Sequence, residues 1–225
     1  EFARSLASLG DIFVNDAFGT AHRAHASTVG VAGYLPAVAG LLMEKELEFL
    51  GMALENPRRP FTALLGGAKI SDKMAVLERL LERLDVLLIG GGMAGTFLKA
   101  KGHEIGGSLL EEESLEFVSK IMATGRDRGI PVVLPVDVVV GDSFDSDATP
   151  KIHGVGDVPE HGHIMDIGPD TVAIFEEYLK KSETVFWNGP MGVYEFPAFA
   201  QGTRRMAQVL AGLKATTVVG GGSTA

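Results

Sequence analysis

The chain has 225 residues, 46% of them hydrophobic, which is enough for one large core or two small ones. Its formal net charge of −9 makes nucleic acids and anionic membrane surfaces poor partners, so any bound anion must be held by a local site. The absence of cysteine excludes disulfides, thiol catalysis and thiolate metal sites, and it is compatible with the cytoplasm, where we expect the protein to act.

The first part of the chain predicts two helices and a short strand around an uncharged stretch. Residues 1–10 have an amphipathic pattern typical of a helix rather than of a secretory leader, and Asp11–Val14 predicts a strand. The stretch Ala24–Met43 carries no charge, but its histidine, hydroxyl, glycine and proline residues make it too polar and too broken to span a membrane. Leu41–Leu54 predicts a helix that ends at a linker-like break, Asn56–Pro60.

Beyond this break, apolar runs alternate regularly with helical patterns. We therefore expect an α/β fold, with a parallel sheet and helices on both faces in a Rossmann-like three-layer arrangement. The expected strands are Phe61–Leu65, Val86–Ile89, Val132–Val140, Thr184–Trp187 and Thr216–Val219. The expected helices are Asp72–Leu84, a short helix ending at Lys101, Glu111–Arg128, Asp170–Lys181 and a helix ending at Leu213. The polar, glycine-rich residues 141–163 predict a solvated surface excursion, including the Asp142–Asp147 cluster, His161 and His163.

Glycine-bearing loops follow four of the expected strands: Gly66-Gly67, Gly90–Gly92, Gly189–Gly192 and Gly220–Gly222. In an open parallel sheet the carboxyl ends of the strands line the ligand crevice. Glycine there lets backbone amides approach a phosphate, and a following helix N-terminus adds favourable partial charge. One such loop indicates little, because tight turns favour glycine anyway. Four loops in one sheet predict a phosphate or nucleotide site.

One of these loops also fits a dinucleotide fingerprint. Gly90–Gly95 has the G-x-G-x-x-G spacing, and Glu111–Glu113 lie about as far onward as a ribose contact would. The alternative function is therefore an NAD(P)-dependent oxidoreductase. We favour it less, because a full strand–helix unit precedes this loop and the acids begin a helix instead of ending a strand.

Two lysines follow the first glycine loop. The segment Gly66–Lys73 lacks the spacing of a P-loop, but Lys69 and Lys73 stand four residues apart around Ser71, a candidate N-cap. Without the glycines, the simplest interpretation would be lysines on a solvated helix start. With them, we favour contact between both lysines and a phosphate.

One arginine and two histidines stand together in the otherwise uncharged end of the segment Asn15–His25. Two histidines fall short of the usual ligand set for zinc, and we predict no metal site in the chain. Arg23, flanked by His22 and His25, suits a carboxylate or a phosphate, which its planar guanidinium can bind through two hydrogen bonds.

The segment Asn188–Phe196 follows a strand and keeps one acid, Glu195, among apolar neighbours. Glu195 could bind ribose hydroxyls, or it could cap the next helix. The sequence leaves both interpretations open.

Together these segments resemble the phosphoglycerate kinases. Six motifs stand in the order in which that family carries them: NDAFGTAHRAH at 15–25, GGAKISDK at 66–73, GGGMAGTFL at 90–98, DIGP at 166–169, NGPMGVYE at 188–195 and GGGST at 220–224. The match extends from Asp11 to the last residue, and the combination is specific although each glycine loop alone is not.

The resemblance implies an enzyme of glycolysis that transfers a phosphoryl group reversibly between ATP and 3-phosphoglycerate. It implies two α/β lobes that close by hinge bending, with phosphoglycerate bound by the amino-terminal lobe and Mg-ATP by the other. Residues 1–40 would be a remnant of the first lobe, 41–56 the interdomain helix and 57–225 a nearly complete nucleotide lobe. We accordingly expect a monomer truncated at both ends and, as a fragment, inactive.

The resemblance also implies roles for individual residues. Arg23 would contact the phosphoglycerate, together with His22 and His25, and Lys69 would stabilise the transferring phosphoryl group. The nucleotide, ATP or ADP, would be bound by Gly67, Lys73, Gly91, Ile164, Asn188, Pro190, Glu195, Gly221, Gly222 and Ser223. In this set Ile164 would lie against adenine and Glu195 would hold ribose.

The sequence departs from the family in two places. The family carries an aspartate between the third glycine and the serine of its terminal loop, whereas here Ser223 follows Gly222 directly. That acid normally contacts Mg²⁺, so the expected metal lacks its usual ligand. Gly95 stands where the family usually has a bulky aromatic residue, which would loosen the adenine side of the pocket.

Overall fold

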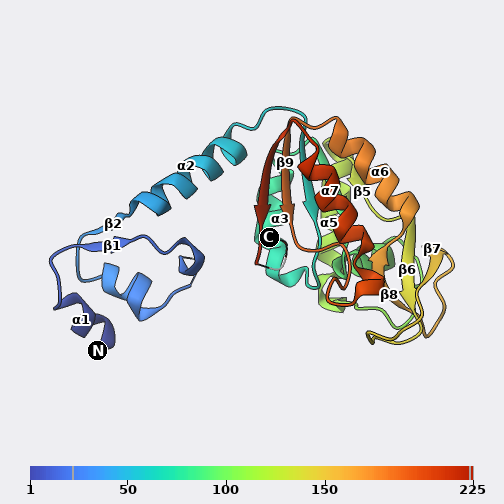
Figure 1. Cartoon of the computed structure of the whole chain (residues 1–225), viewed down its shortest axis with the longest axis horizontal. Coiled ribbons are helices and arrows are strands. Elements are labelled where there is room, and N and C mark those ends of the chain that lie inside the picture. The colour runs from blue at the N-terminus through green and yellow to red at the C-terminus, as the bar shows by residue number, and fades with distance from the viewer. Residues whose placement is uncertain (22, 223, 225) are drawn as a thin grey trace. The chain divides into compact units, whose positions relative to one another are not determined.

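The computed structural model describes residues 1–21, 23–222 and 224, without the side chains of residues 50 and 52–54. The chain divides into two compact units, Glu1–Pro57 and Arg58–Ala225 (Figure 1).

The first unit contains both predicted helices and a two-stranded parallel pair. Its elements are α1 (Phe2–Ala7), β1 (Phe13–Asn15), a π-helical turn (Ala26–Gly30), β2 (Ala37–Ala39) and α2 (Leu41–Glu55). Strand β2 was not predicted, because three residues between Pro36 and Gly40 are too few to show an alternating pattern. The side chain of Asp16 caps the beginning of α2: its carboxylate accepts hydrogen bonds from the Leu42 and Met43 amides at 2.7 and 3.0 Å.

The second unit is built on a five-stranded parallel sheet. Its strands are β3 (Phe61–Leu65), β4 (Val86–Ile89), β5 (Val132–Val133), β9 (Thr184–Asn188) and β10 (Thr216–Gly220). They lie in the order β10-β9-β3-β4-β5, so the first of them along the chain is in the middle and the order reverses between β3 and β9. In doubly wound sheets this reversal marks the ligand crevice, at the carboxyl ends of the strands.

Helices cover both faces of this sheet, as predicted (Figure 1). On one face, α6 (Pro169–Lys180) and α7 (Gln201–Ala211) pack through Phe175 and Met206 against Leu64, Leu88 and Trp187 of the strands. The other face is covered by α3 (Met74–Leu81), α4 (Met93–Ala100) and α5 (Leu115–Asp127). All five residues of β3 are buried, which is why its sequence is a nearly unbroken apolar run.

A small antiparallel sheet corrects one prediction. The expected strand Val132–Val140 is two strands, β5 in the main sheet and β6 (Asp137–Gly141) in a second sheet of order β7-β6-β8. Pro135, which has no N–H to donate to a ladder, stands in the break between them. The expected excursion 141–163 contains β7 (Lys151–Gly154) and the first residue of β8 (His163–Ile167), which was also missed.

Two buried aspartates of the small sheet cap the helices on the first face. Asp137 accepts the Asp170 and Thr171 amides at the start of α6, at 3.0 and 2.7 Å. Asp166 accepts the Gly202 amide at the start of α7, at 2.7 Å. Each carboxylate pairs amides that the first turn of a helix leaves without partners.

No helix in the described part of the chain combines the length and the apolar character needed to cross a bilayer.

Candidate functional site

The glycine loops after β3, β4, β9 and β10 each place one glycine at positive φ: Gly67, Gly91, Gly189 and Gly221. Three of these loops, those after β3, β4 and β9, pack so closely that only glycine fits at their contacts. A Cβ at Gly91 would lie 2.5 Å from the Gly67 nitrogen, and a Cβ at Gly189 would overlap the Gly66 carbonyl. The loops at the sheet's reversal point therefore interlock through their backbones.

Hydrogen bonds between the loops occupy two of the glycine amides that the sequence predicted to approach a phosphate. The Gly67 amide donates to the Pro190 carbonyl at 2.8 Å, and the Gly91 amide donates to the Met191 carbonyl at 3.0 Å. These two amides are thus paired within the protein. A ligand contact by Gly67 or Gly91 would use Cα or the carbonyl rather than the N–H.

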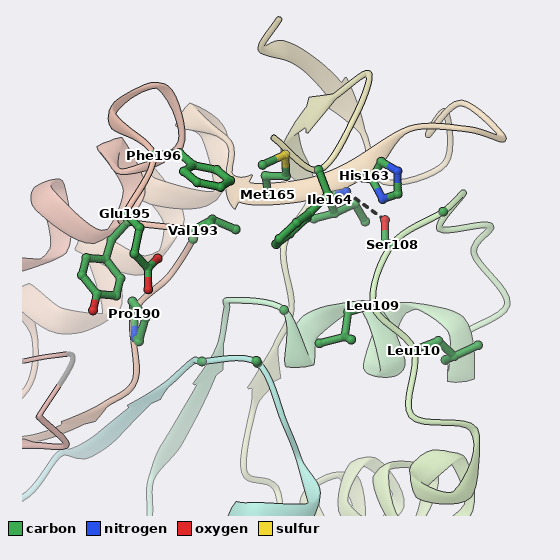
Figure 2. Close-up of a pocket in the computed structure, with 17 residues that line it drawn as sticks. Ser108, Leu109, Leu110, His163, Ile164, Met165, Pro190, Val193, Glu195 and Phe196 are labelled. Carbon is green, nitrogen blue, oxygen red and sulfur yellow. Dashed lines mark hydrogen bonds between the residues drawn. The ribbon is translucent and has the colours of Figure 1, made fainter. Parts of the chain in front are cut away.

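A cavity of about 950 Å³ opens beside these loops (Figure 2). One wall is formed by His163, Ile164 and Met165 of β8, and the facing wall by the segment 190–196, without Met191. The remainder comes from Gly67, Ala68, Gly92, the segment Gly107–Leu110 and Phe144. A concave, mainly apolar cavity with few polar groups is typical of a small-molecule site.

Four of the predicted nucleotide residues line this cavity: Gly67, Ile164, Pro190 and Glu195. Figure 2 shows Ile164 on one wall and Glu195 on the other. Ile164 is held in place by its amide, which donates to the Ser108 hydroxyl at 2.8 Å. The side chain of Glu195 is exposed, so its carboxylate is available to a polar ligand group.

An aromatic group at the cavity was missed from the sequence. Phe144 contacts His163 and Phe196 edge-on, with ring centroids 6.3 and 6.0 Å apart, and all three residues line the cavity. Residues 142–147 and His163 were predicted to be solvated. Phe144 is 61% exposed and the aspartates of the cluster are exposed too, as predicted, whereas His163 is half-buried. A lone phenylalanine in an acidic loop was the signal that could have found the group.

The two predicted lysines differ in their surroundings. Lys73 is half-buried, and its Nζ lies 3.2 Å from where a Cβ of Gly67 would be, so its ammonium group covers the loop after β3. Lys69 is exposed and close enough to Glu111 to influence the ionisation of that side chain.

Glu111, a ribose ligand in the oxidoreductase alternative, instead holds the beginning of the helix after β3. Its carboxylate accepts the Ile70 and Ser71 amides, at 2.5 and 3.2 Å. Burial acts to raise the pKa of Glu111, but the hydrogen bonds from Ser71 and Ile70 and the charge of Lys69 outweigh it and lower this pKa. Ser71 is therefore not the side-chain cap that the sequence predicted.

The strand order also disfavours the oxidoreductase alternative. The dinucleotide fingerprint normally follows the first, central strand of such a sheet. Here the loop Gly90–Gly95 follows β4, the neighbour of the central strand β3. Gly95 lies buried in α4, where a Cβ would approach the Leu109 carbonyl to 2.7 Å, so the small residue lets the segment Gly107–Leu110 pack against the helix.

Other predicted residues lie near the cavity without lining it. Asn188 Nδ2 lies 3.1 Å from where a Cβ of Gly220 would be, and the Gly189 amide donates to Thr224 Oγ1 at 2.8 Å. Gly221 and Gly222 continue the loop after β10. Ser223 falls outside the described residues.

The predicted phosphoglycerate ligands belong to the first unit. Arg23 and His25 are exposed, and the turn that carries them is fixed by the Thr28 hydroxyl, which donates to the Arg23 carbonyl at 2.7 Å. His22 lies outside the described residues. Within the part of the chain that the structure describes, no three His, Asp or Glu side chains gather in a way that could hold a metal.

Comparisons with known proteins agree with this architecture. The family model described as phosphoglycerate kinase matches residues 1–225. The phosphoglycerate kinase of Roseiflexus sp. (strain RS-1) is 54% identical over 222 residues, which cover 99% of this chain and 56% of the relative. The chain thus spans little more than half the length of that protein.

Solved structures extend the agreement to three dimensions. The phosphoglycerate kinase structure from Coxiella burnetii matches with a TM-score of 0.89 and 46% identity, over 99% of this chain and 58% of the other. The crystal structure of phosphoglycerate kinase from Pyrococcus horikoshii OT3 matches with a TM-score of 0.81 and 35% identity, over 98% and 56% of the two chains. The chain belongs to the phosphoglycerate kinase family.

Proposed function

We propose that residues 58–225 form the adenine-nucleotide-binding part of a phosphoglycerate kinase, which transfers a phosphoryl group reversibly between ATP and 3-phosphoglycerate. The observation that carries this proposal is the apolar cavity beside the interlocked loops of β3 and β9, at the reversal of the strand order, in a chain of this family. In the complete protein we expect a cytoplasmic monomer acting in glycolysis.

The lining of the cavity suits a nucleotide. The apolar walls around Ile164 and Val193 would hold a base, while Glu195 at the edge would accept hydrogen bonds from ribose hydroxyls. Lys73, above the loop after β3, would neutralise phosphate oxygens present in the ground state. Asn188, Gly221, Gly222 and Ser223 remain candidates for further phosphate contacts.

Lys69 is the candidate for the reaction itself. Phosphoryl transfer depends mainly on positioning and on neutralising the charge of the transferring group. Lys69 is exposed on the same loop as Gly67, so its ammonium group is accessible to a phosphoryl group. The carboxylate of Glu111 is an acidic neighbour that interacts electrostatically with this ammonium group. Arg23, with His22 and His25, would bind the phosphoglycerate.

The described residues do not by themselves fit a magnesium site. No three His, Asp or Glu side chains among them gather in a way that could hold a metal, and no acid separates Gly222 from Ser223. Mg²⁺ commonly needs only one or two protein carboxylates when phosphates supply other ligands.

Isothermal titration calorimetry with ADP and with NAD tests the proposal. We expect ADP to bind more tightly than NAD, and the opposite order would overturn the assignment. Ile164→Asp should abolish ADP binding, because it places a charge against the base. Ile152→Asp makes the same change on the exposed strand β7, outside the cavity, and should leave binding unchanged.

A further inference from the structure

The carboxylate of Asp166 lies behind the cavity, where three segments of the second unit meet. Asp166 follows the wall residues Ile164 and Met165 on β8 and is 2% exposed. Its oxygens accept the Gly202 amide at 2.7 Å and the Ile167 amide at 2.9 Å, and the Gln201 amide also donates to it. This single side chain is therefore bonded to β8 and to the beginning of α7.

The same carboxylate also touches the opposite wall. A Cβ at Gly192 would overlap Asp166 Oδ1, so the backbone of the wall segment rests directly on this side chain. The next residue, Val193, donates its amide to the Met165 carbonyl at 2.8 Å. The two walls of the cavity are thus joined at their base, with Asp166 in the joint.

We propose that Asp166 is a positioning residue of the cavity: its buried carboxylate fastens the segment Gly189–Gly202 to β8 and so sets the separation of the walls between which the nucleotide base binds. This inference rests on the proposed nucleotide site.

The ionisation of Asp166 decides whether it can do this. Burial raises the pKa of Asp166 to about 7, against the opposite influence of the Gly202, Ile167 and Gln201 amides. A protonated carboxyl presents an O–H where an amide donor needs an acceptor, so protonation removes one of the fastening bonds. The charged form is therefore the one that holds the walls, and it prevails only above neutral pH.

No charged side chain is among the causes of this pKa shift. The titratable and charged residues on the elements packed around Asp166, within the described chain, are Asp137 on β6, His163 on β8, Tyr194 and Glu195 on the wall segment, and Arg204 and Arg205 on α7.

Asp137 offers a matched control. Like Asp166, it is a buried aspartate of the small sheet that caps a helix through backbone amides. Unlike Asp166, Asp137 bonds to α6, and its partners Asp170 and Thr171 do not line the cavity. If Asp166 acted only by capping a helix, Asp166→Asn and Asp137→Asn would change ADP affinity equally.

The experiment measures ADP affinity of the chain by calorimetry between about pH 6 and pH 8.5, a window that spans the pKa of Asp166, for the wild type, Asp166→Asn and Asp137→Asn. Asn imitates the protonated acid. At the alkaline end we expect Asp166→Asn to bind ADP roughly tenfold more weakly than the wild type, the effect of losing one hydrogen bond to a charged group. The ratio of the Kd of Asp166→Asn to that of the wild type should shrink toward one as the pH falls. The ionisation of ADP affects both proteins equally, so it cancels in this ratio. Asp137→Asn should give a ratio near one throughout.

Three results would overturn the inference while leaving ADP binding intact: unchanged affinity in Asp166→Asn, a ratio that does not vary with pH, or equal losses in both variants. Absence of ADP binding by the wild type would instead refute the proposed function. If Asp166→Asn does not fold, the wild-type profile decides, after correction for the phosphate ionisation of ADP. A corrected affinity that stays constant across neutral pH contradicts the role of Asp166.

Discussion

Replacing Gly91 by alanine tests whether the interlocked loops shape the site. Gly91 has φ +64°, and an added Cβ would lie 2.5 Å from the Gly67 nitrogen and 2.7 Å from the Pro190 carbonyl oxygen. Alanine in a left-handed conformation costs about 1–2 kcal/mol, and overpacking against backbone costs about 1–3 kcal/mol more. We therefore expect Gly91→Ala to lower the free energy of unfolding by roughly 2–5 kcal/mol and to weaken ADP binding.

Gly129 separates the two contributions. It has nearly the same backbone conformation, φ +69°, but a Cβ there would meet nothing within 4 Å. Gly129→Ala should thus show only the conformational cost, about 1–2 kcal/mol, and normal ADP binding. Urea titrations followed by the fluorescence of Trp187, the sole tryptophan, report on the second unit. Equal destabilisation by the two substitutions, or unchanged ADP affinity in Gly91→Ala, would refute the packing argument.

Four other predictions concern the reaction and the ionisable groups. In the complete enzyme, Lys69→Ala should lower kcat by about 10²–10³ with little change in the KM for ATP, whereas Lys73→Ala should act mainly on nucleotide affinity. Steady-state kinetics test both variants. If the two lysines only lie on a solvated helix, neither variant will show a kinetic defect. The present chain, which spans 56% of its relative, should show no turnover in a coupled assay of ATP formation from 1,3-bisphosphoglycerate and ADP, and full activity would contradict the assigned division of labour. Phe144→Ala should weaken ADP binding by up to about tenfold, because an aromatic contact contributes about 0.5–1.5 kcal/mol; calorimetry measures this. Burial raises the folded-state pKa of Asp166 from 3.8 to about 7, so the folded state favours the protonated acid although only the charged form accepts all the amide hydrogen bonds. The stabilising contribution of Asp166 is therefore present at low pH and lost as the pH rises through 7. Urea titrations at about pH 5 and pH 8 should therefore show the stability difference between wild type and Asp166→Asn changing by about 2.5 kcal/mol, and a constant difference would refute the shift.

The centre of the main sheet could be predicted because β9, β3 and β4 are largely buried on both faces and therefore stand out as apolar runs between amphipathic helices. The small sheet could not. Strand β7 is mostly exposed, and Asp137 and Asp166 look like surface residues until the helices that they cap are in place. Local patterns record periodicity but not a partner thirty residues away along the chain.

Only part of the candidate site could be predicted, because contacts between distant segments form the rest. Ile164, Pro190 and Glu195, which the resemblance assigned to the nucleotide, line the cavity. Phe144 lies on the cavity through contacts with His163 and Phe196, which belong to other segments. Glycines were assigned to phosphate contact, yet Gly91 and Gly189 are required first by contacts between loops, which no single loop sequence contains.

The pairing of β3 with β9 has a consequence for how the second unit folds. Strands β3 and β4 are close in sequence, with Thr62 facing Val86, but in the central pair Phe61 faces Thr184. Closing so long a loop costs more entropy, so the local β3–α3–β4 unit should form before β9 arrives. The cavity requires loops from both sides of that late pairing. A bound nucleotide should accordingly slow unfolding strongly while leaving the rate of folding almost unchanged.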